Sequence, residues 1–197
     1  STQKGSDIAN KKNYQVITSL GSQGSTTGTD LQGINGNLNG NYVLGSNIDA
    51  SATSAWNSNG SGGYDGFNPI GNNLNDSNYV NYFNGTFDGL GHTISNLYIN
   101  HPSQVYIGLF GYAMNATIKN IGVVDFEIYA EGYSGGLVGS AETTQISNSY
   151  STGGIYAYNY FGGLIGHLNN SSSIEYSYSL ANIIKGTSNN QLSRTLF

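Results

Sequence analysis

The chain has 197 residues, no cysteine, and a formal net charge of −5 from 11 acidic and 6 basic residues. Without cysteine it forms no disulfide, thiol nucleophile or cysteine-ligated zinc site. The few scattered bases argue against a nucleic-acid groove, and no apolar run approaches the roughly 18 residues of a membrane span. We therefore expect neither a nucleic-acid partner nor membrane insertion. Charged residues make up only 9% of the chain, while 29 glycines and 16 tyrosines favour structure and surface over chemistry.

The N-terminal part is predicted to close one end of the fold. Residues 1–13 are interpreted as a loose lead-in, and residues 14–50 as a capping segment with the first coil, whose strand is expected from Tyr42 to Ile48. A short helix laid across the end of a stack of strands would cover exposed strand edges.

A capping box locates that helix. Thr29 and Gln32 have the required spacing, and apolar residues follow at helical spacing. Two glycines inside the segment weaken the helix by about 1 kcal/mol each. The apolar residues are Leu31, Ile34 and Leu38, and the glycines are Gly33 and Gly36.

Residues 51–104 are interpreted as irregular coils with long loops. The sequence Ile-Ser-Asn-Leu at 94–97 resembles the segments at 118–121 and 146–149. Asn96, Asn120 and Asn148 are therefore expected to form one column of stacked amides, with Tyr176 in the place of asparagine in the last coil. Which residues after this column point inward stays open.

Residues 105–197 contain a regular repeat with a period of 27–28 residues, and the last repeat is incomplete. Glycine-bracketed apolar pairs begin at Gly108, Gly136 and Gly163, and two isoleucine columns keep the same period. Three columns with one period are hard to produce by chance. The isoleucine columns are Ile118, Ile146 and Ile174, and Ile128, Ile155 and Ile183.

Each period contains three short apolar clusters separated by turn-forming residues, which is typical of short strands. About 27 residues match one coil of a three-sided parallel β-helix, in which each strand stacks on its counterpart in the next coil. Antiparallel hairpins favour two-residue turns, whereas these connections are longer and irregular. The predicted fold class is therefore an all-β, three-sided parallel solenoid with a short N-terminal capping helix.

The glycine-bracketed repeats, of which Gly136-Leu137-Val138-Gly139 is the purest copy, resemble the GLUG motif of large bacterial surface proteins. Four further strings, at 14–21, 41–51, 66–71 and 85–94, resemble filamentous-haemagglutinin-type exoproteins. The resemblance implies a right-handed β-helix and a passenger segment of an adhesin exported by a two-partner system. It also implies an outer-membrane export partner for the parent protein. The chain lacks the export domain of that family and is therefore expected to be a fragment.

Asp125 and Glu127 are a candidate catalytic pair of a glycosidase, because some parallel β-helices degrade polysaccharides. Asp125 and Glu127 alternate as i and i+2, so both can project from one strand face, and glycosidases use two carboxylates. The other glutamates are scattered through separate turns and strands, which favours a solvated face over a catalytic pair. These are Glu131, Glu142 and Glu175.

The remaining candidates for chemistry are isolated. His92, His101 and His167 have no His or carboxylate at i+2 or i+4, so they predict no metal site. His92 follows Gly91 in a turn, where a hydrogen bond to the backbone is expected. The segment 62–65 resembles a calcium-binding repeat but has no tandem copy. We expect no catalytic residue, no metal and no cofactor.

Tyrosines are the more informative polar feature. Tyr150 and Tyr178 lie 28 residues apart, and Tyr133 and Tyr160 lie 27 apart. Stacked tyrosines support a coil structurally, and they also offer a rigid amphipathic surface to a partner or a sugar ring. These four residues are the candidate binding surface.

The function predicted from the sequence is that of a structural and adhesive segment of a secreted or surface-displayed bacterial exoprotein. Its expected partner is a glycan or protein on a host or neighbouring cell. Two alternatives stay open, a β-helical carbohydrate-active enzyme and a spacer that binds nothing.

Three candidate glycosylation sites give a first prediction. Asn84, Asn115 and Asn170 match the acceptor pattern Asn-x-Ser/Thr, and the adhesins that the chain resembles include members with sugar on such residues. Intact-mass measurement of native protein is expected to show hexose on these asparagines. A mass equal to that of the bare polypeptide would contradict the prediction.

Overall fold

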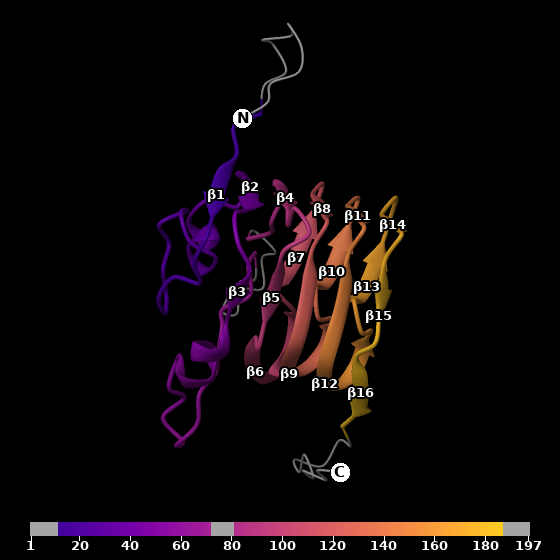
Figure 1. Cartoon of the computed structure of the whole chain (residues 1–197). Coiled ribbons are helices and arrows are strands. Elements are labelled where there is room, and N and C mark those ends of the chain that lie inside the picture. Colours follow the sequence, from indigo (N-terminus) through magenta and orange to yellow (C-terminus); the bar gives the residue numbers. More distant parts are fainter. Residues whose placement is uncertain (1–11, 72–80, 187–197) are drawn as a thin grey trace, which may run out of the picture.

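The fold is a parallel β-solenoid of about six turns with almost no helix, as a computed structural model shows for residues 12–71 and 81–186 (Figure 1). Strands from successive turns lie side by side and form three sheets, so the three-sided solenoid expected from the repeats is confirmed. All pairings between named strands are parallel.

Each sheet collects the strands that occupy the same place in successive coils. The first sheet consists of β1 (Gln15–Ile17), β2 (Asn41–Leu44), β4 (Thr86–Asp88), β8 (Thr117–Lys119), β11 (Gln145–Ser147) and β14 (Ser173–Glu175). The second consists of β3 (Ile48–Asp49), β5 (Thr93–Ser95), β6 (Tyr98–Ile107), β9 (Gly122–Ser134), β12 (Tyr150–Phe161), β15 (Tyr178–Ser179) and β16 (Asn182–Lys185). The third consists of β7 (Phe110–Met114), β10 (Val138–Glu142) and β13 (Ile165–Asn169).

The strand register confirms the columns predicted from the repeat. Ile146 pairs with Ile118 on one side and Ile174 on the other, and the column of Ile128, Ile155 and Ile183 is paired in the same way. The leucines of the glycine-bracketed pairs are buried in the core between the sheets. They are Leu109, Leu137 and Leu164, with 0%, 0% and 8% of their surface exposed.

Close packing of backbone explains why glycine brackets these pairs. A Cβ atom on Gly139 would lie 2.6 Å from the carbonyl oxygen of Gly111 and from the amide nitrogen of Ile107. At Gly166 it would lie 2.3 Å from the amide nitrogen of Ser134. Real Cβ atoms do not approach backbone so closely, so only glycine fits at these positions of β10 and β13. The motif is therefore a packing requirement of the stacked coils.

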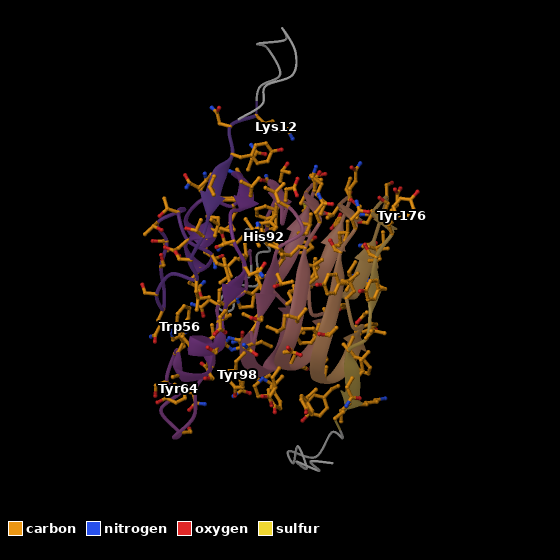
Figure 2. The ribbon with its side chains drawn as sticks, in the orientation of Figure 1. Lys12, Trp56, Tyr64, His92, Tyr98 and Tyr176 are labelled. Atoms are coloured by element: carbon orange, nitrogen blue, oxygen red, sulfur yellow. The ribbon has the colours of Figure 1, made fainter. Side chains whose placement is uncertain are left out.

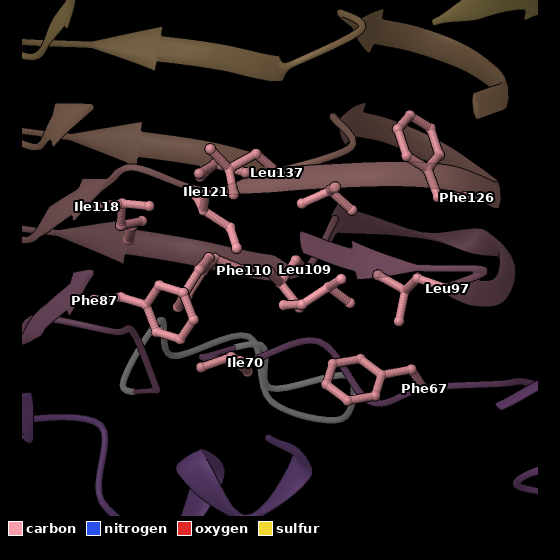
Figure 3. Packing of buried hydrophobic residues seen from close by; sticks show 14 of the residues in the cluster. Phe67, Ile70, Phe87, Leu97, Leu109, Phe110, Ile118, Ile121, Phe126 and Leu137 are labelled. Carbon is pink, nitrogen blue, oxygen red and sulfur yellow. The ribbon is translucent and has the colours of Figure 1, made fainter. Parts of the chain in front are cut away.

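The core continues toward the N-terminus through aromatic residues (Figure 3). Phe110 of β7 packs against Phe83 and Phe87, with ring centroids 4.9 and 5.2 Å apart. Ile70 and Phe83 also form parallel bridges to β7, so short segments extend the third sheet by one further layer. Such aromatic pairs stabilise a core beyond the area that they bury.

The predicted asparagine column is only partly correct. Asn120, Asn148 and Tyr176 share a left-handed backbone, with φ of 56°, 49° and 49°, and they occupy one corner of successive coils. Asn96 does not belong to this column. Ile94 pairs with Val123 of the second sheet, whereas the partner of Ile118 is Phe87. The similarity of residues 94–97 to residues 118–121 led to a wrong placement of Asn96, because loops in the early coils change the number of residues between equivalent strands.

The expected N-terminal helix is a short 3₁₀ helix, η2 (Gln32–Gly36), and it has no capping box. The Thr29 hydroxyl donates to Thr27, while the Asp30 carboxylate accepts the Gly33 N–H at 2.7 Å. Gln32 faces Asn68 and bonds its backbone N–H and carbonyl at 3.1 and 3.0 Å. The carboxylate is the stronger acceptor, and Gln32 is occupied elsewhere, so Thr29 caps nothing.

The neighbouring prediction of one strand from Tyr42 to Ile48 was also wrong. Residues 45–47 turn between β2 and β3, which belong to different sheets. A strand that sequence reasoning missed, β1, lies before them and pairs with β2. A second 3₁₀ helix, η3 (Ser51–Ala55), follows β3. Residues 1–11 of the lead-in predicted at 1–13, and residues 187–197 of the incomplete last coil, fall outside the described residues.

Burial ends abruptly at the last coil. Ile174 and Ile183 are 42% and 40% exposed, although their column partners in earlier coils are at most 1% exposed. The same side-chain positions therefore change from core to surface at the C-terminal end of the stack, where Tyr176 lies (Figure 2). Within the described residues, no helix is long and apolar enough to cross a membrane.

Substitution of Leu137 tests whether the leucine column carries the core. Leu137→Ala is expected to lower the free energy of unfolding by about 2–5 kcal/mol, because it removes buried methyl groups and leaves a cavity. Leu180→Ala is the matched control, because Leu180 is 75% exposed, and surface substitutions usually change stability by less than about 0.5 kcal/mol. Chemical denaturation measures both, and equal unfolding midpoints for the two variants would contradict a buried column.

Candidate binding surface

One ladder of tyrosine rings follows a corner of the solenoid at the C-terminal ends of β6, β9 and β12. Tyr133 stacks between Tyr106 and Tyr160, with ring centroids 5.2 and 4.7 Å apart and interplanar angles of 14° and 7°. All three have a left-handed backbone, with φ of 63°, 45° and 47°. Left-handed φ is uncommon for a bulky residue, so the corner repeats one strained conformation in three coils.

Two further ladders run along the second sheet. Tyr129 stacks on Tyr156 at 4.6 Å and 9°, and Tyr98 joins this pair in a tilted arrangement at 6.3 Å. Tyr150 stacks on Tyr178 at 5.4 Å and 9°. The two tyrosine pairs predicted from the period are therefore stacked, but they belong to different ladders.

Sequence reasoning missed four members of the ladders, and three of them keep the period of the repeat. Tyr106 precedes Tyr133 by 27 residues, and Tyr129 precedes Tyr156 by 27. The same count that found the predicted pairs would have found these. The signal was present in the period.

Stacking decides which atoms of a ladder meet solvent. Parallel rings less than 5.5 Å apart cover each other's faces, so they present edges and hydroxyl groups outward. Tyr160 and Tyr178 are 63% and 56% exposed because they lie in late coils. An open aromatic face for a sugar ring is thus confined to the end of a ladder, and the ladders otherwise present rows of hydroxyl groups.

A polar network joins the corner ladder to the third sheet. The Tyr112 hydroxyl donates to Glu142 Oε2 at 2.5 Å, and Asn170 Nδ2 donates to Glu142 Oε1 at 2.6 Å. His167 lies edge-on to Tyr133 at 5.0 Å, with its Nδ1 3.3 Å from Ser140 Oγ. These contacts tie three coils together across their outer surface.

The carboxylate pair on β9 has separate environments. Asp125 is exposed and has a left-handed backbone, with φ of 53°. Glu127 is half-buried and accepts a hydrogen bond from the Tyr129 hydroxyl. Within residues 12–71 and 81–186, no three His, Asp or Glu side chains gather as metal ligands would.

The three histidines lie in different elements: His92 in the turn before β5, His101 in β6 and His167 in β13. His92 Nδ1 is 3.1 Å from the side-chain oxygen of Asn47, so its partner is a side chain and not the expected backbone group. His101 is buried, and its Nε2 has no hydrogen-bond partner among the described residues. Burial lowers the pKa of His101, against the opposing pull of the Asp65 carboxylate.

The three candidate glycosylation residues are all exposed. Asn115 and Asn170 lie at corners with φ of 55° and 52°. Asn84 lies just before β4, and its N–H donates to the Leu38 carbonyl. The acceptor amides of Asn84 and Asn115 make no hydrogen bond to the described residues, whereas that of Asn170 is bound to Glu142.

Asp88 is the most connected carboxylate at the corner between the first and second sheets. It accepts the Leu90 N–H at 3.0 Å and Asn120 Nδ2 at 2.9 Å, and it pairs with Lys119 Nζ at 3.3 Å. Burial by itself raises the pKa of Asp88, but these three donors together hold it below its usual value. Asp88 thus fixes the turn after β4 to the next coil.

Comparison with known proteins adds a family motif to this geometry. The model of the GLUG motif matches residues 130–156, which include the β10 repeat. Halomucin of Haloquadratum walsbyi (strain DSM 16790 / HBSQ001) is 38% identical over 115 residues, which are 57% of this chain and 1% of that protein. No solved structure matches the chain.

Together these findings define the chain as a parallel β-solenoid with a GLUG motif, which fits a segment of a surface or secreted protein. The chain spans about 1% of the length of the curated relative that it matches. The GLUG part of the resemblance is confirmed, and the filamentous-haemagglutinin type of adhesin stays a prediction.

The Asp88 network predicts a specific response to acid. A carboxylate with a lowered pKa contributes stability above its unfolded pKa of about 3.9, and this stability is lost as the pH falls through the folded pKa. Asp88→Asn is expected to lower the unfolding midpoint at pH 7 and to flatten its decline below about pH 5.

The matched variant is Lys119→Met, which removes only the ion pair. The Lys119 side chain is 37% exposed, so solvent screens the pair and the loss is expected to be smaller than in Asp88→Asn. Thermal unfolding from pH 7 to pH 2 measures both variants. An acid profile of Asp88→Asn that coincides with the unsubstituted chain would show that the network contributes nothing.

Proposed function

We propose that the chain is a structural and adhesive segment of an extracellular or surface-displayed protein, and that it binds cells or glycans without chemical turnover. The observation that carries this proposal is the repetition of tyrosine ladders in register on stacked coils. Each ladder presents the same polar groups at the spacing of adjacent strands, about 4.8 Å. The coils hold these groups rigid, so little conformational entropy is lost on binding.

The proposed mechanism of adhesion has two parts, the length of the stacked coils and the repetition of weak binding contacts along them. One coil uses 27–28 residues and lengthens the stack by only about 4.8 Å, so a long parent protein is needed to project far from a surface. Weak contacts repeated along such a molecule add through avidity without any single strong pocket. The proposed partner is a glycan or protein on a host or neighbouring cell, and the resemblance adds an export partner in the outer membrane for the parent.

The rival function, a β-helical carbohydrate-active enzyme, depends on Asp125 and Glu127. General acid–base work needs titratable groups that neighbours gather and tune. The Glu127 carboxylate accepts a hydrogen bond from the Tyr129 hydroxyl of its own strand, and Asp125 is an exposed residue of β9 with a left-handed backbone. This arrangement favours a solvated face over a pair that flanks a glycosidic bond.

Binding without turnover has a direct test. Beads that display many copies of the chain are expected to retain cells or immobilised glycans, whereas the free chain binds them feebly, because avidity multiplies weak contacts. Uncoated beads are the control. Equal binding by the free and displayed chains, or none by either, would contradict the proposal.

The same preparation is then incubated with a panel of polysaccharides, and it is expected to release no reducing ends or unsaturated products. Cleavage that disappears in Asp125→Ala or Glu127→Ala would make the enzyme the better assignment.

A further inference from the structure

A hollow of about 440 Å³ lies at the corner where the first sheet passes into the second. It extends over three successive coils, since it is lined by the turn after β4, the corner at Asn120 and the corner at Asn148. Figure 2 labels His92, the residue next to this turn. The volume falls within the range of small-ligand pockets, about 300–1,000 Å³.

A missing side chain forms one part of this hollow. Gly122 pairs with Thr93 in the preceding coil and with Tyr150 in the next. The Tyr150 ring leans over Gly122, and a Cβ atom there would lie 2.5 Å from Tyr150 Cζ. The same ring stacks on Tyr178 at 5.4 Å. The Tyr150 ring is therefore held in place by its contacts with Gly122 and Tyr178, and it lines the hollow.

Two polar side-chain groups that line the hollow, on Asn148 and Tyr150, are available to bind a ligand. Asn120 already donates to Asp88, but the Asn148 carboxamide and the Tyr150 hydroxyl make no hydrogen bond to any residue that the structure describes. A carboxamide offers two donor hydrogens and an acceptor oxygen. Asn148 is held at a corner with φ of 49°, so its amide is presented by a well-defined backbone.

The rim adds an apolar contact. Leu90 is 58% exposed and has φ of 50°, a backbone that leucine rarely adopts. A strained residue that exposes an apolar side chain beside a hollow is a candidate for function. None of the described lining residues carries a charge at neutral pH, so the hollow suits a neutral ligand.

We propose that this hollow binds one residue of a neutral polysaccharide. A sugar ring has apolar C–H faces that fit Leu90 and the edge of Tyr150, and neighbouring hydroxyl groups that fit the Asn148 carboxamide. The site occurs once in the described chain, because the next coil carries Tyr176 in the place of Asn148. The inference rests on the proposed adhesive function and names its ligand class.

The test uses affinity electrophoresis of the full chain in gels that contain dextran, mannan or the anionic polysaccharide alginate. Dextran or mannan is expected to retard the chain. Asn148→Gly removes the amide and keeps a residue that tolerates positive φ, so we expect about a tenfold loss of affinity, the scale of one or two hydrogen bonds. Leu90→Gly, which relieves strain and removes the apolar rim, is expected to weaken binding as well.

Asn115→Gly is the matched control, because Asn115 is an exposed asparagine with φ of 55° outside the hollow. It is expected to bind within about twofold of the unsubstituted chain, and unfolding midpoints check that all variants are folded.

Retardation by dextran or mannan that survives both Asn148→Gly and Leu90→Gly would overturn this site and leave the adhesive function standing. Retardation by alginate alone would overturn the neutral ligand class. Binding to cells by displayed chains, with no retardation in any gel, would overturn the glycan site only, whereas loss of both would overturn the adhesive function too.

Discussion

Parallel pairing of each strand with its counterpart in the next coil, 27–28 residues away in the regular coils, is the constraint on which the rest of this structure depends. Backbone hydrogen bonds between coils are satisfied only if the strands of each coil lie in register with those of the previous one, so extra residues must fall in loops. This forces residue types into columns, as at Ile118, Ile146 and Ile174. An apolar column inside becomes the core, and a column outside becomes a repeated surface.

The corners follow from the same constraint. A chain that turns from sheet to sheet within a few residues needs left-handed backbone at fixed points, and this structure places Asn120, Asn148 and Tyr133 there. Within the strands, where backbones of neighbouring coils approach closely, as at Gly139 of β10, only glycine fits. Part of the surface chemistry is therefore set at the corners, where Tyr133 stacks between Tyr106 and Tyr160 and where Asn148 is exposed.

The regular coils could be predicted from the sequence because their period is visible in three columns at once. The early coils could not, because their loops change the spacing. The segment that contains Ile94 and Asn96 resembles the segment at 118–121 of the first sheet, but its strand β5 belongs to the second sheet. A helix near residues 29–38 was expected, and η2 lies there, yet the capping box failed because Gln32 bonds to Asn68, 36 residues away, which no local pattern reveals.

The candidate site shows the same division. Stacking of Tyr133 on Tyr160 followed from their spacing, whereas the hollow depends on the side chain that Gly122 lacks and on the ring of Tyr150 that leans across it. Gly122 does not stand out in the sequence, and the spacing that singles out Tyr150 does not show that its ring lies over Gly122. Contacts between equivalent residues of successive coils can be predicted from the period of the sequence. Sites formed where a coil departs from the repeat can be found only in the three-dimensional structure.

Cysteine cross-linking tests the coil register most directly, because the chain contains no cysteine of its own. Thr117 and Gln145 are paired neighbours on adjacent strands of the first sheet, and their separation suits a disulfide, whose Cα atoms lie about 4.4–6.8 Å apart. Thr117 and Ser147 are offset by two residues, which places them beyond about 7 Å. The account predicts that the double variant Thr117→Cys, Gln145→Cys forms an intramolecular disulfide under mild oxidation, and that Thr117→Cys, Ser147→Cys does not. Cross-linking of the offset pair alone, or of neither pair, would contradict the stacked parallel coils.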